Sequence, residues 1–422
     1  MKKNKIKHYG LDLYTETLNN GMVVNIIPKD NVSNIYTTFS TYYGSFHNDF
    51  IPLGEKKFYS APLGVAHFLE HKVFEQEDGS EPFAFYTSHG ADANASTSFK
   101  KTTYLFSGAG FADENVEYLL DFVQSPYFTE ENVEKEKGII EQEIKMYDDI
   151  PYWRLYEKTL ENSFINHPLK YPIAGTVETV RKITKEDLYK CYNTFYHPSN
   201  MFLTIVGNVD PKKVIETVKK NQKNKNYGEL EKIALKEYKE PDKVNKEYEE
   251  IPFDIKIPKA TLSYKINILD YDDNKLKNYL SIFFALKLGS TSELNEKLKS
   301  EGLISSPIEA EIIFADNHAL AVLIFESNDY LKVINYVEEE LKDIKIDAND
   351  LNRKKKVFKS SCIYRSDSIY SIASKINSNL ISFGKVILDE YKLIDELNID
   401  EFNDIFIKLN FDNKAIVVIK NV

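Results

Sequence analysis

Short apolar runs alternate with amphipathic stretches along the first two hundred or so residues. Apolar, β-branched and aromatic runs predict strands, and we expect them at residues 22–28, 35–43, 97–106 and 201–206. Apolar residues at helical spacing predict helices at residues 113–123 and 130–147. A turn-rich patch with Pro62 and Gly64 leads into a further helical segment that carries the letters HFLEHKVF. The pattern indicates a domain that mixes strands and helices.

The composition changes between residues 223 and 254, where Lys, Glu, Asn and Tyr dominate and Pro241 and Pro252 interrupt the chain. Such a stretch is typical of a linker that runs over the surface. Beyond it the pattern restarts, with strands expected near residues 260–266, 319–325 and 415–419 and helices near 278–288 and 292–301. We therefore predict two related domains, 1–222 and 255–422, joined by a linker at 223–254.

Composition and charge exclude several classes of protein. Hydrophobic residues make up 42% and charged residues 28%, as in an ordinary globular protein. No apolar run approaches the roughly 20 residues that span a bilayer, and no apolar stretch follows the basic N-terminus, so we expect a cytoplasmic protein. The net charge of −11 disfavours nucleic acid as a partner. Cys191 and Cys362 lack any paired spacing and are expected to be buried free thiols.

The letters HFLEH at residues 67–71 form a candidate metal motif. On a helix, positions i, i+3 and i+4 share a face, so His67 and His71 can present two imidazoles to one Zn²⁺, with Glu70 beside them. A catalytic zinc site needs one more protein ligand and an open position for water, whose proton a nearby carboxylate can take. A chance match to this inverted motif has a probability of roughly 1%. The competing interpretation is two surface histidines that flank a solvated glutamate.

A second helix, EKEKGIIEQEIKMYDD at 134–149, offers the missing ligand. Glu136 and Glu143 are two turns apart on one face, and Ile140 lies between them on the same stripe. A glutamate on a core-facing stripe is costly unless it is paired or bound to a metal. We therefore predict Glu143 as a ligand and Glu136 as its support. Without the histidine motif, the acidic face of a charged helix would explain both residues.

These residues resemble the pitrilysin/insulysin-type zinc peptidases, and within them the mitochondrial-processing-peptidase-like bacterial branch that includes processing proteases and bacteriocin-maturation proteins. The resemblance is strongest over residues 40–210. The matching stretches are HFLEHKVFE (67–75), GADANASTSFKKTTYLFS (90–107), SPYFTEENVEKEKGIIEQEIKMYDD (125–149), IAGTVETVRKIT (173–184) and FYHPSNMFLTIVGNVD (195–210). The resemblance implies an α+β fold of two related domains, each a mostly antiparallel sheet with helices packed on one face, the second domain without metal.

The resemblance also assigns roles. It implies that His67, His71 and Glu143 bind zinc, that Glu70 activates water, and that Glu136 is the family's second acidic residue at the active site. Peptide is expected to pair as an added strand beside the Asn94-Ala95 pair. Residues 289–303, GSTSELNEKLKSEGL, resemble the family's second domain. There, Arg365 and Tyr370 are candidates by position for holding the substrate carbonyl, although a role on the surface of a helix explains them as well.

The leading hypothesis is a zinc endopeptidase that cleaves unfolded or short peptides, with a precursor or bacteriocin-type peptide as candidate substrate. The family encloses substrate between four such domains and this chain has length for two, so the resemblance implies a second copy or a related subunit as partner. The alternative is a non-catalytic, peptide-binding or scaffolding subunit of a heterodimer. A structural zinc domain fits poorly, because neither cysteine lies near the motif.

Overall fold

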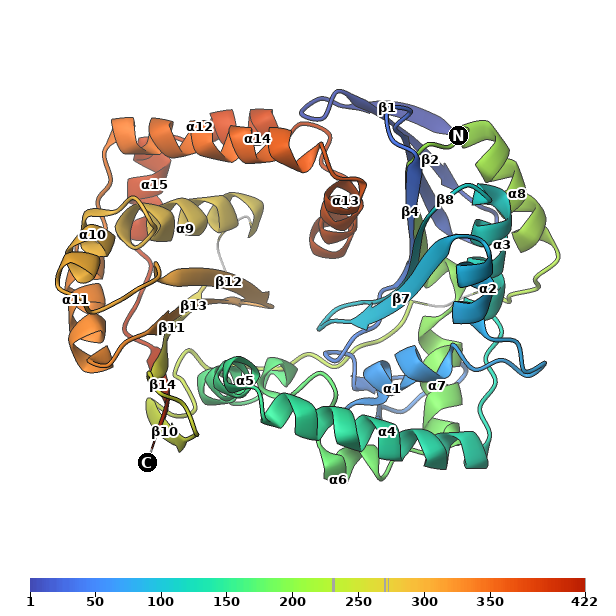
Figure 1. Cartoon of the computed structure of the whole chain (residues 1–422), viewed down its shortest axis with the longest axis horizontal. Coiled ribbons are helices and arrows are strands. Elements are labelled where there is room, and N and C mark those ends of the chain that lie inside the picture. The colour runs from blue at the N-terminus through green and yellow to red at the C-terminus, as the bar shows by residue number, and fades with distance from the viewer. Residues whose placement is uncertain (230–231, 269–270, 272, 422) are drawn as a thin grey trace. The chain divides into compact units, whose positions relative to one another are not determined.

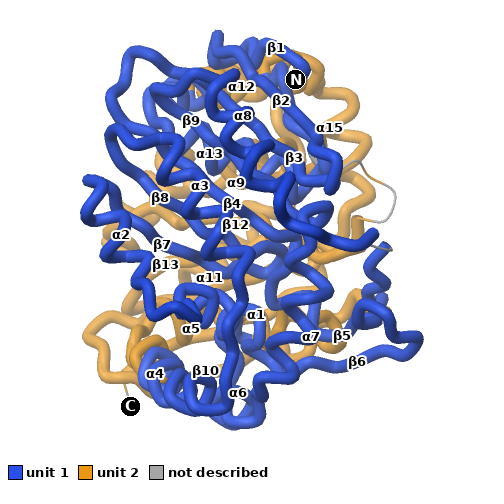
Figure 2. Tube along the Cα trace, turned by 90° about the vertical axis from the view of Figure 1, so that its right-hand side faces the viewer, with its two compact units in different colours: residues 1–144, 172–237, 361–390 blue, residues 145–171, 238–360, 391–422 orange. Residues whose placement is uncertain are grey.

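The chain forms two compact units, described here from a computed structural model that covers residues 1–229, 232–268, 271 and 273–421. Unit 1 comprises residues 1–144, 172–237 and 361–390, and unit 2 comprises residues 145–171, 238–360 and 391–422 (Figure 2). Among the described residues, no helix is long and apolar enough to cross a membrane.

Unit 1 is built on a seven-stranded sheet (Figure 1). Its strands, in spatial order, are β1 (Lys2–Ile6), β2 (Leu11–Thr17), β3 (Val23–Pro28), β9 (Met201–Gly207), β4 (Asn34–Thr41), β8 (Thr102–Ala109) and β7 (Ala91–Thr97). Neighbouring strands are antiparallel except β3 and β9, which are parallel. Strand β7 therefore lies at one edge of the sheet. A separate ribbon pairs β5 (Asp49–Phe50) with β6 (Tyr59–Ser60).

Side chains alternate between the two faces of this sheet, and each face is covered by helices. Val24 and Phe39 point into the main core of the unit, whereas Ile27 and Tyr36 belong to a separate core on the opposite face. The main core also takes residues from α1 (Val65–Lys72), α2 (Pro82–Ser88), α3 (Ala112–Val123), α4 (Glu130–Asp148), α6 (Val177–Val180), α7 (Lys185–Phe195) and α8 (Pro211–Lys223). The opposite face is covered by α13 (Ile369–Phe383).

Unit 2 repeats this plan with a five-stranded sheet. Its order is β10 (Tyr248–Pro252), β14 (Lys414–Lys420), β11 (Lys259–Asn267), β13 (His318–Glu326) and β12 (Glu309–Ala315), with only β10 and β14 parallel. Helices that contribute to its main core are α9 (Asp273–Lys287), α10 (Glu293–Ser300), α11 (Tyr330–Lys342), α12 (Ala348–Arg365) and α15 (Ile399–Phe406). Helix α14 (Glu390–Glu396) ends just before the core residue Leu397. The other face receives α5 (Pro151–Ser163), whose Leu155 packs against Val417 and Ile419.

The predicted α+β class with mostly antiparallel sheets is confirmed, but helices cover both faces of each sheet and not the single face predicted. Helix α13 comes from the second half of the chain but covers a face of unit 1, and α5 comes from the first half but covers a face of unit 2. The sequence boundaries at residues 222 and 255 stay a prediction. The linker segment does not run wholly over the surface: the carboxylate of Glu240, 4% exposed, pairs with the buried Lys265 and accepts the backbone N–H of Asn166.

The strand predicted at residues 97–106 is wrong in one respect, because a turn interrupts it. Strand β7 ends at Thr97 and β8 begins at Thr102. The Ser98 N–H donates to the Lys101 carbonyl at 2.8 Å, and the Lys101 N–H returns to Ser98 Oγ at 3.3 Å. A serine hydroxyl closes this hairpin without the glycine or proline that usually signals a turn in sequence.

Gly64 sets the direction in which helix α1 enters the core. It caps the helix with φ +93°, and its carbonyl accepts the Phe68 N–H at 2.8 Å. A Cβ added to Gly64 would lie 2.4 Å from the carbonyl oxygen of Ala174. Both the dihedral angle and the close approach therefore require glycine.

We expect Gly64→Ala to destabilise unit 1 by about 3 kcal/mol, since it combines left-handed strain with a collision against backbone. Gly79→Ala is the matched control: Gly79 has φ +74° but open space around its Cβ position, so it should cost about 1 kcal/mol. Urea unfolding measures both. Equal losses in the two variants would contradict the role given to the contact with Ala174.

Candidate metal centre

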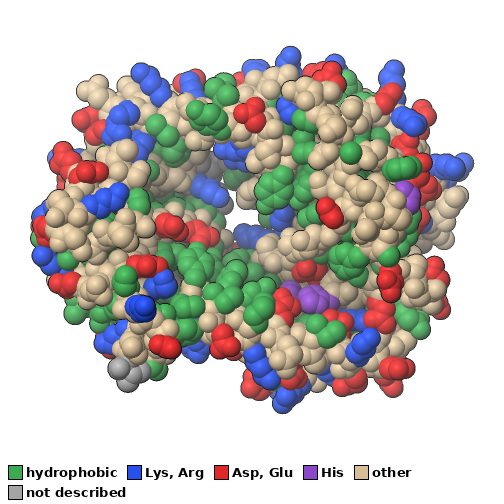
Figure 3. All heavy atoms as spheres, in the orientation of Figure 1, with side chains coloured by type: hydrophobic (Ala, Val, Ile, Leu, Met, Phe, Trp, Pro, Cys, Tyr) green, Lys and Arg blue, Asp and Glu red, His purple; other side chains and the backbone are tan. Residues whose placement is uncertain are grey.

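Helix α1 has one buried and one open face. Phe68, Leu69 and Lys72 are buried, whereas His67, Glu70 and His71 are only partly covered. The partly covered residues are those at positions i, i+3 and i+4, so the predicted shared face exists. In Figure 3, histidine and acidic side chains meet at the surface over α1 and α4.

Helix α4 brings two glutamates to that face. Val133 and Ile140 are buried in the core of unit 1, and Glu136 and Glu143 lie on the same stripe of the helix. Their side chains are 13% and 21% exposed, which is low for glutamate in a helix as acidic as this one.

The two helices bring His67, His71 and Glu143 together. One ligand atom from each lies within 4.8 Å of the others, and among the described residues this is the group of histidine, cysteine or acidic side chains that could hold a metal ion. The Nε2 atom of His67 is 3.6 Å from Glu143 Oε1, and that of His71 is 3.4 Å from Glu143 Oε2. Both imidazoles thus present Nε2 to one carboxylate.

This donor set fits Zn²⁺. Tetrahedral zinc with bonds of about 2.0–2.2 Å to nitrogen and oxygen keeps neighbouring ligand atoms about 3.3–3.6 Å apart, in agreement with the distances from Glu143 to the two imidazoles. Two imidazoles and one carboxylate form the three-ligand set of catalytic zinc sites, which leave one position open.

Glu136 orients His71. The carboxylate can only accept, so the Nδ1–H of His71 donates to Glu136 Oε1 at 3.0 Å and the Nε2 lone pair is left for a metal. Lys72, whose side chain is 1% exposed, lies 3.7 Å from Glu136 Oε2 and pairs with Glu75. Burial, the largest single effect, disfavours the charged form of both partners. Their mutual hydrogen bond and the surrounding charges together outweigh it, so the pKa of His71 is raised and that of Glu136 is lowered.

A residue of the sheet holds the side chain of Glu70 in place. Its Oε2 accepts a 2.6 Å hydrogen bond from the hydroxyl of Thr97, the last residue of β7. Asn94 and Ala95 lie in the same strand, which is at the edge of the sheet among the described residues. The Ala95 N–H donates to Asn94 Oδ1 at 2.8 Å.

The structure does not bring Arg365 and Tyr370 to this cluster. Arg365 forms a 2.9 Å ion pair with Glu390 and lies 3.5 Å from the Tyr9 hydroxyl. Tyr370, 59% exposed, packs edge-on against Tyr36 at 5.4 Å, and Tyr36 belongs to the core on the sheet face opposite α1.

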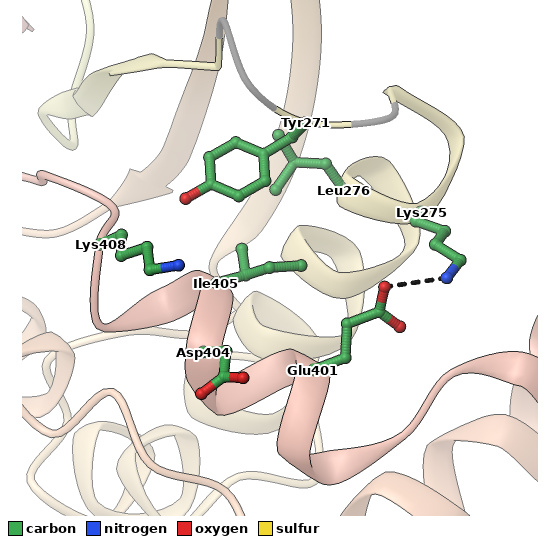
Figure 4. Close-up of a pocket in the computed structure, with 7 residues that line it drawn as sticks. All are labelled: Tyr271, Lys275, Leu276, Glu401, Asp404, Ile405 and Lys408. Carbon is green, nitrogen blue, oxygen red and sulfur yellow. Dashed lines mark hydrogen bonds and ion pairs between the residues drawn. The ribbon is translucent and has the colours of Figure 1, made fainter.

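A cavity of about 350 Å³ in unit 2 is separate from the cluster (Figure 4). It lies between α9 and α15, and Lys275 and Glu401 form a 2.8 Å ion pair at its wall. The remaining lining residues are Tyr271, Leu276, Asp404, Ile405 and Lys408. None of them is a candidate ligand from the motif, so we do not assign the cavity to the metal centre.

Two residues of the site were missed in the sequence. Lys72 reads as one more surface lysine after the motif, and only its burial reveals the link to Glu136. Thr97 reads as a β-branched strand residue. No local sequence pattern predicts the hydrogen bond from Thr97 to Glu70, because these residues lie on different elements.

Comparison with known proteins gives a consistent result. Residues 54–177 match the family described as Insulinase (Peptidase family M16), and residues 182–358 match the one described as Peptidase M16 inactive domain. The zinc protease YmfH of Bacillus subtilis (strain 168) is 47% identical over 295 residues, 69% of each chain. A putative M16-like peptidase from Alicyclobacillus acidocaldarius has a similar structure, with a TM-score of 0.92 and 30% identity over 98% of this chain and 99% of that one.

A second similar structure belongs to a longer chain. The periplasmic protease PqqL from Escherichia coli superposes with a TM-score of 0.79 at 19% identity, over 100% of this chain but 48% of its own. At that identity the likeness concerns the fold alone.

The fold and the matched relatives place this chain in the class of peptidase-family proteins. The chain belongs to the insulinase family, peptidase family M16. The segment that matches the insulinase description contains all five predicted metal-binding and catalytic residues, which are His67, Glu70, His71, Glu136 and Glu143. The segment that matches the inactive domain contains none of the five.

We expect His71 in the metal-free protein to titrate above the ordinary histidine value, and Glu136→Gln to lower its pKa, because burial then acts without the anionic acceptor. An NMR pH titration of the imidazole signals measures both. Glu134→Gln, on the exposed face of the same helix, is the control and should leave His71 unchanged. An unaltered titration in Glu136→Gln would contradict the pairing.

Proposed function

We propose that the chain is a zinc-dependent endopeptidase that cleaves unfolded or short peptides. The observation that carries this proposal is the convergence of His67, His71 and Glu143, with Glu70 on the same helix face. The names of the relatives agree with it, since YmfH is called a zinc protease.

The proposed division of labour follows from the chemistry of each side chain. The metal would be held by His67, His71 and Glu143. When bound, Zn²⁺ would act as a Lewis acid that makes water nucleophilic at neutral pH. Glu70 takes a proton from the attacking water and passes it to the nitrogen of the leaving amine. Glu136 keeps His71 in the tautomer whose Nε2 can bind, through its bond to Nδ1.

We expect Glu70→Gln to retain zinc and to lose at least a hundredfold in kcat, because the amide cannot accept the proton. Glu143→Ala should instead lose zinc and activity together. Zinc content of the purified proteins and cleavage of a fluorogenic peptide measure the two effects. Unchanged cleavage by Glu70→Gln would refute its role as base. A wild-type chain that binds no zinc would favour the alternative, a non-catalytic subunit.

Peptide binding is proposed at the free edge of β7. An extended peptide can add there as a further strand, with main-chain hydrogen bonds that give affinity and little sequence selection. The Ala95 N–H, now bonded to its neighbour's side chain, is one donor that such a strand would use.

We expect Ala95→Pro to lower kcat/KM about tenfold or more while zinc stays bound, because proline removes this donor. Ala95→Ser keeps the N–H at similar size and is the matched control. Steady-state kinetics with a short fluorogenic peptide gives the comparison. Similar losses in both variants would point to side-chain packing and not to strand pairing.

A partner is part of the proposal. The chain matches about half of PqqL, whose length would accommodate two copies of this fold. We infer that a second copy or a related subunit completes the peptidase and supplies the groups that hold the substrate carbonyl. In this chain Arg365 pairs with Glu390, and Tyr370 lies against Tyr36 on the sheet face opposite α1. A precursor or bacteriocin-type peptide remains the proposed substrate. Native mass measurement of the purified complex identifies the partner.

A further inference from the structure

The hydroxyl of Thr97 has a single strong acceptor, the carboxylate of Glu70. Its Oγ1 lies 2.6 Å from Glu70 Oε2 and 3.5 Å from the carbonyl oxygen of Ala66. A hydroxyl carries one proton and a carboxylate only accepts, so the short bond is a donation from Thr97 to Glu70. Glu70 Oε1 has no hydrogen-bond partner in the part of the chain that the structure describes.

Thr97 is itself held in place from the neighbouring strand. It pairs directly with Thr102 of β8, and the two hydroxyl oxygens are 3.3 Å apart. Thr102 donates its proton to the carbonyl of Tyr43 at 2.9 Å and is fully buried. The β-branched side chain of Thr97 also has few rotamers to choose from. The proton of Thr97 is therefore directed at Glu70.

The strand that ends at Thr97 also carries Asn94 and Ala95 at its free edge. We propose that Thr97 is a positioning residue that occupies one oxygen of Glu70, leaves Oε1 to take the proton from water, and ties the base to the strand on which the peptide pairs. A peptide added to β7 is then placed in register with the base by a single element of structure. This inference rests on the proposed peptidase function.

The test compares Thr97→Val with Thr97→Ser. Valine keeps the shape and the strand preference of threonine but removes the donor, whereas serine keeps the donor. The full chain is used together with any subunit that co-purifies, on one fluorogenic peptide that the wild type cleaves. We expect Thr97→Val to lower kcat roughly tenfold to a hundredfold, as for loss of a hydrogen bond to a charged group, with KM nearly unchanged. Thr97→Ser should restore most of kcat.

Two further readouts separate positioning from a general structural role. Zinc affinity, measured by competition with a chelator, and the urea midpoint should both stay at the wild-type value in Thr97→Val. In a double-mutant cycle, Thr97→Val added to Glu70→Gln should cause no further loss, because the group that it positions is gone.

The outcomes distinguish this inference from the proposed function. Wild-type kcat in Thr97→Val, a loss that serine does not rescue, or full additivity with Glu70→Gln would each overturn the role of Thr97 while leaving zinc-dependent cleavage intact. A wild-type protein without zinc-dependent cleavage would overturn the proposed function itself, and with it the basis of this inference.

Discussion

The geometry of the candidate metal centre depends on the core of unit 1, in which helices α1 and α4 both bury apolar residues. Val133 and Ile140 of α4 are buried in the same core as Phe68 of α1. The two apolar residues share a helical stripe with Glu136 and Glu143, so burying them fixes the rotation of α4 about its axis. Burial in this shared core therefore determines on which side of α4 the carboxylates lie, and it places Glu143 3.6 Å and 3.4 Å from the two imidazoles.

The same arrangement of α1 and α4 brings several negative charges close together, and these charges need compensating partners. Three carboxylates, Glu70, Glu136 and Glu143, gather around two histidines, and partly buried acids are stable only with partners. Glu136 has His71 and the buried Lys72, and Glu70 has the hydroxyl of Thr97. Apolar side chains in these positions would give an equally or more stable protein. A contribution to folding therefore does not explain the polar cluster.

The exchange of helices α5 and α13 makes the two halves of the sequence interdependent. The core that α13 covers contains Ile27 and Tyr36, far away in sequence from Ile376. In unit 2, the hydroxyls of Thr159 on α5 and Thr261 on β11 meet at 2.6 Å. Each compact unit therefore takes segments from both halves of the sequence.

Local periodicity was enough to predict much of the fold and the centre of the site. Spacing predicted the shared face of His67, Glu70 and His71, the stripe that carries Glu136 and Glu143, and seven of the fourteen strands in the described residues. Helical and extended repeats depend only on neighbours in sequence. The hairpin turn at residues 98–101 leaves no such signal in the spacing, because a serine side chain closes it.

The remaining partners were decided by tertiary structure. Thr97 meets Glu70 27 residues away, Lys72 is buried against Glu136, and Arg365 is engaged by Glu390 instead of standing free. Packing between elements determines which strand a helix lies against and which charged side chain is buried as a result. The residue pattern along a single element carries no information about that packing. The sequence by itself determined which residues could bind a metal. Only the folded chain decided which neighbours hold them in position.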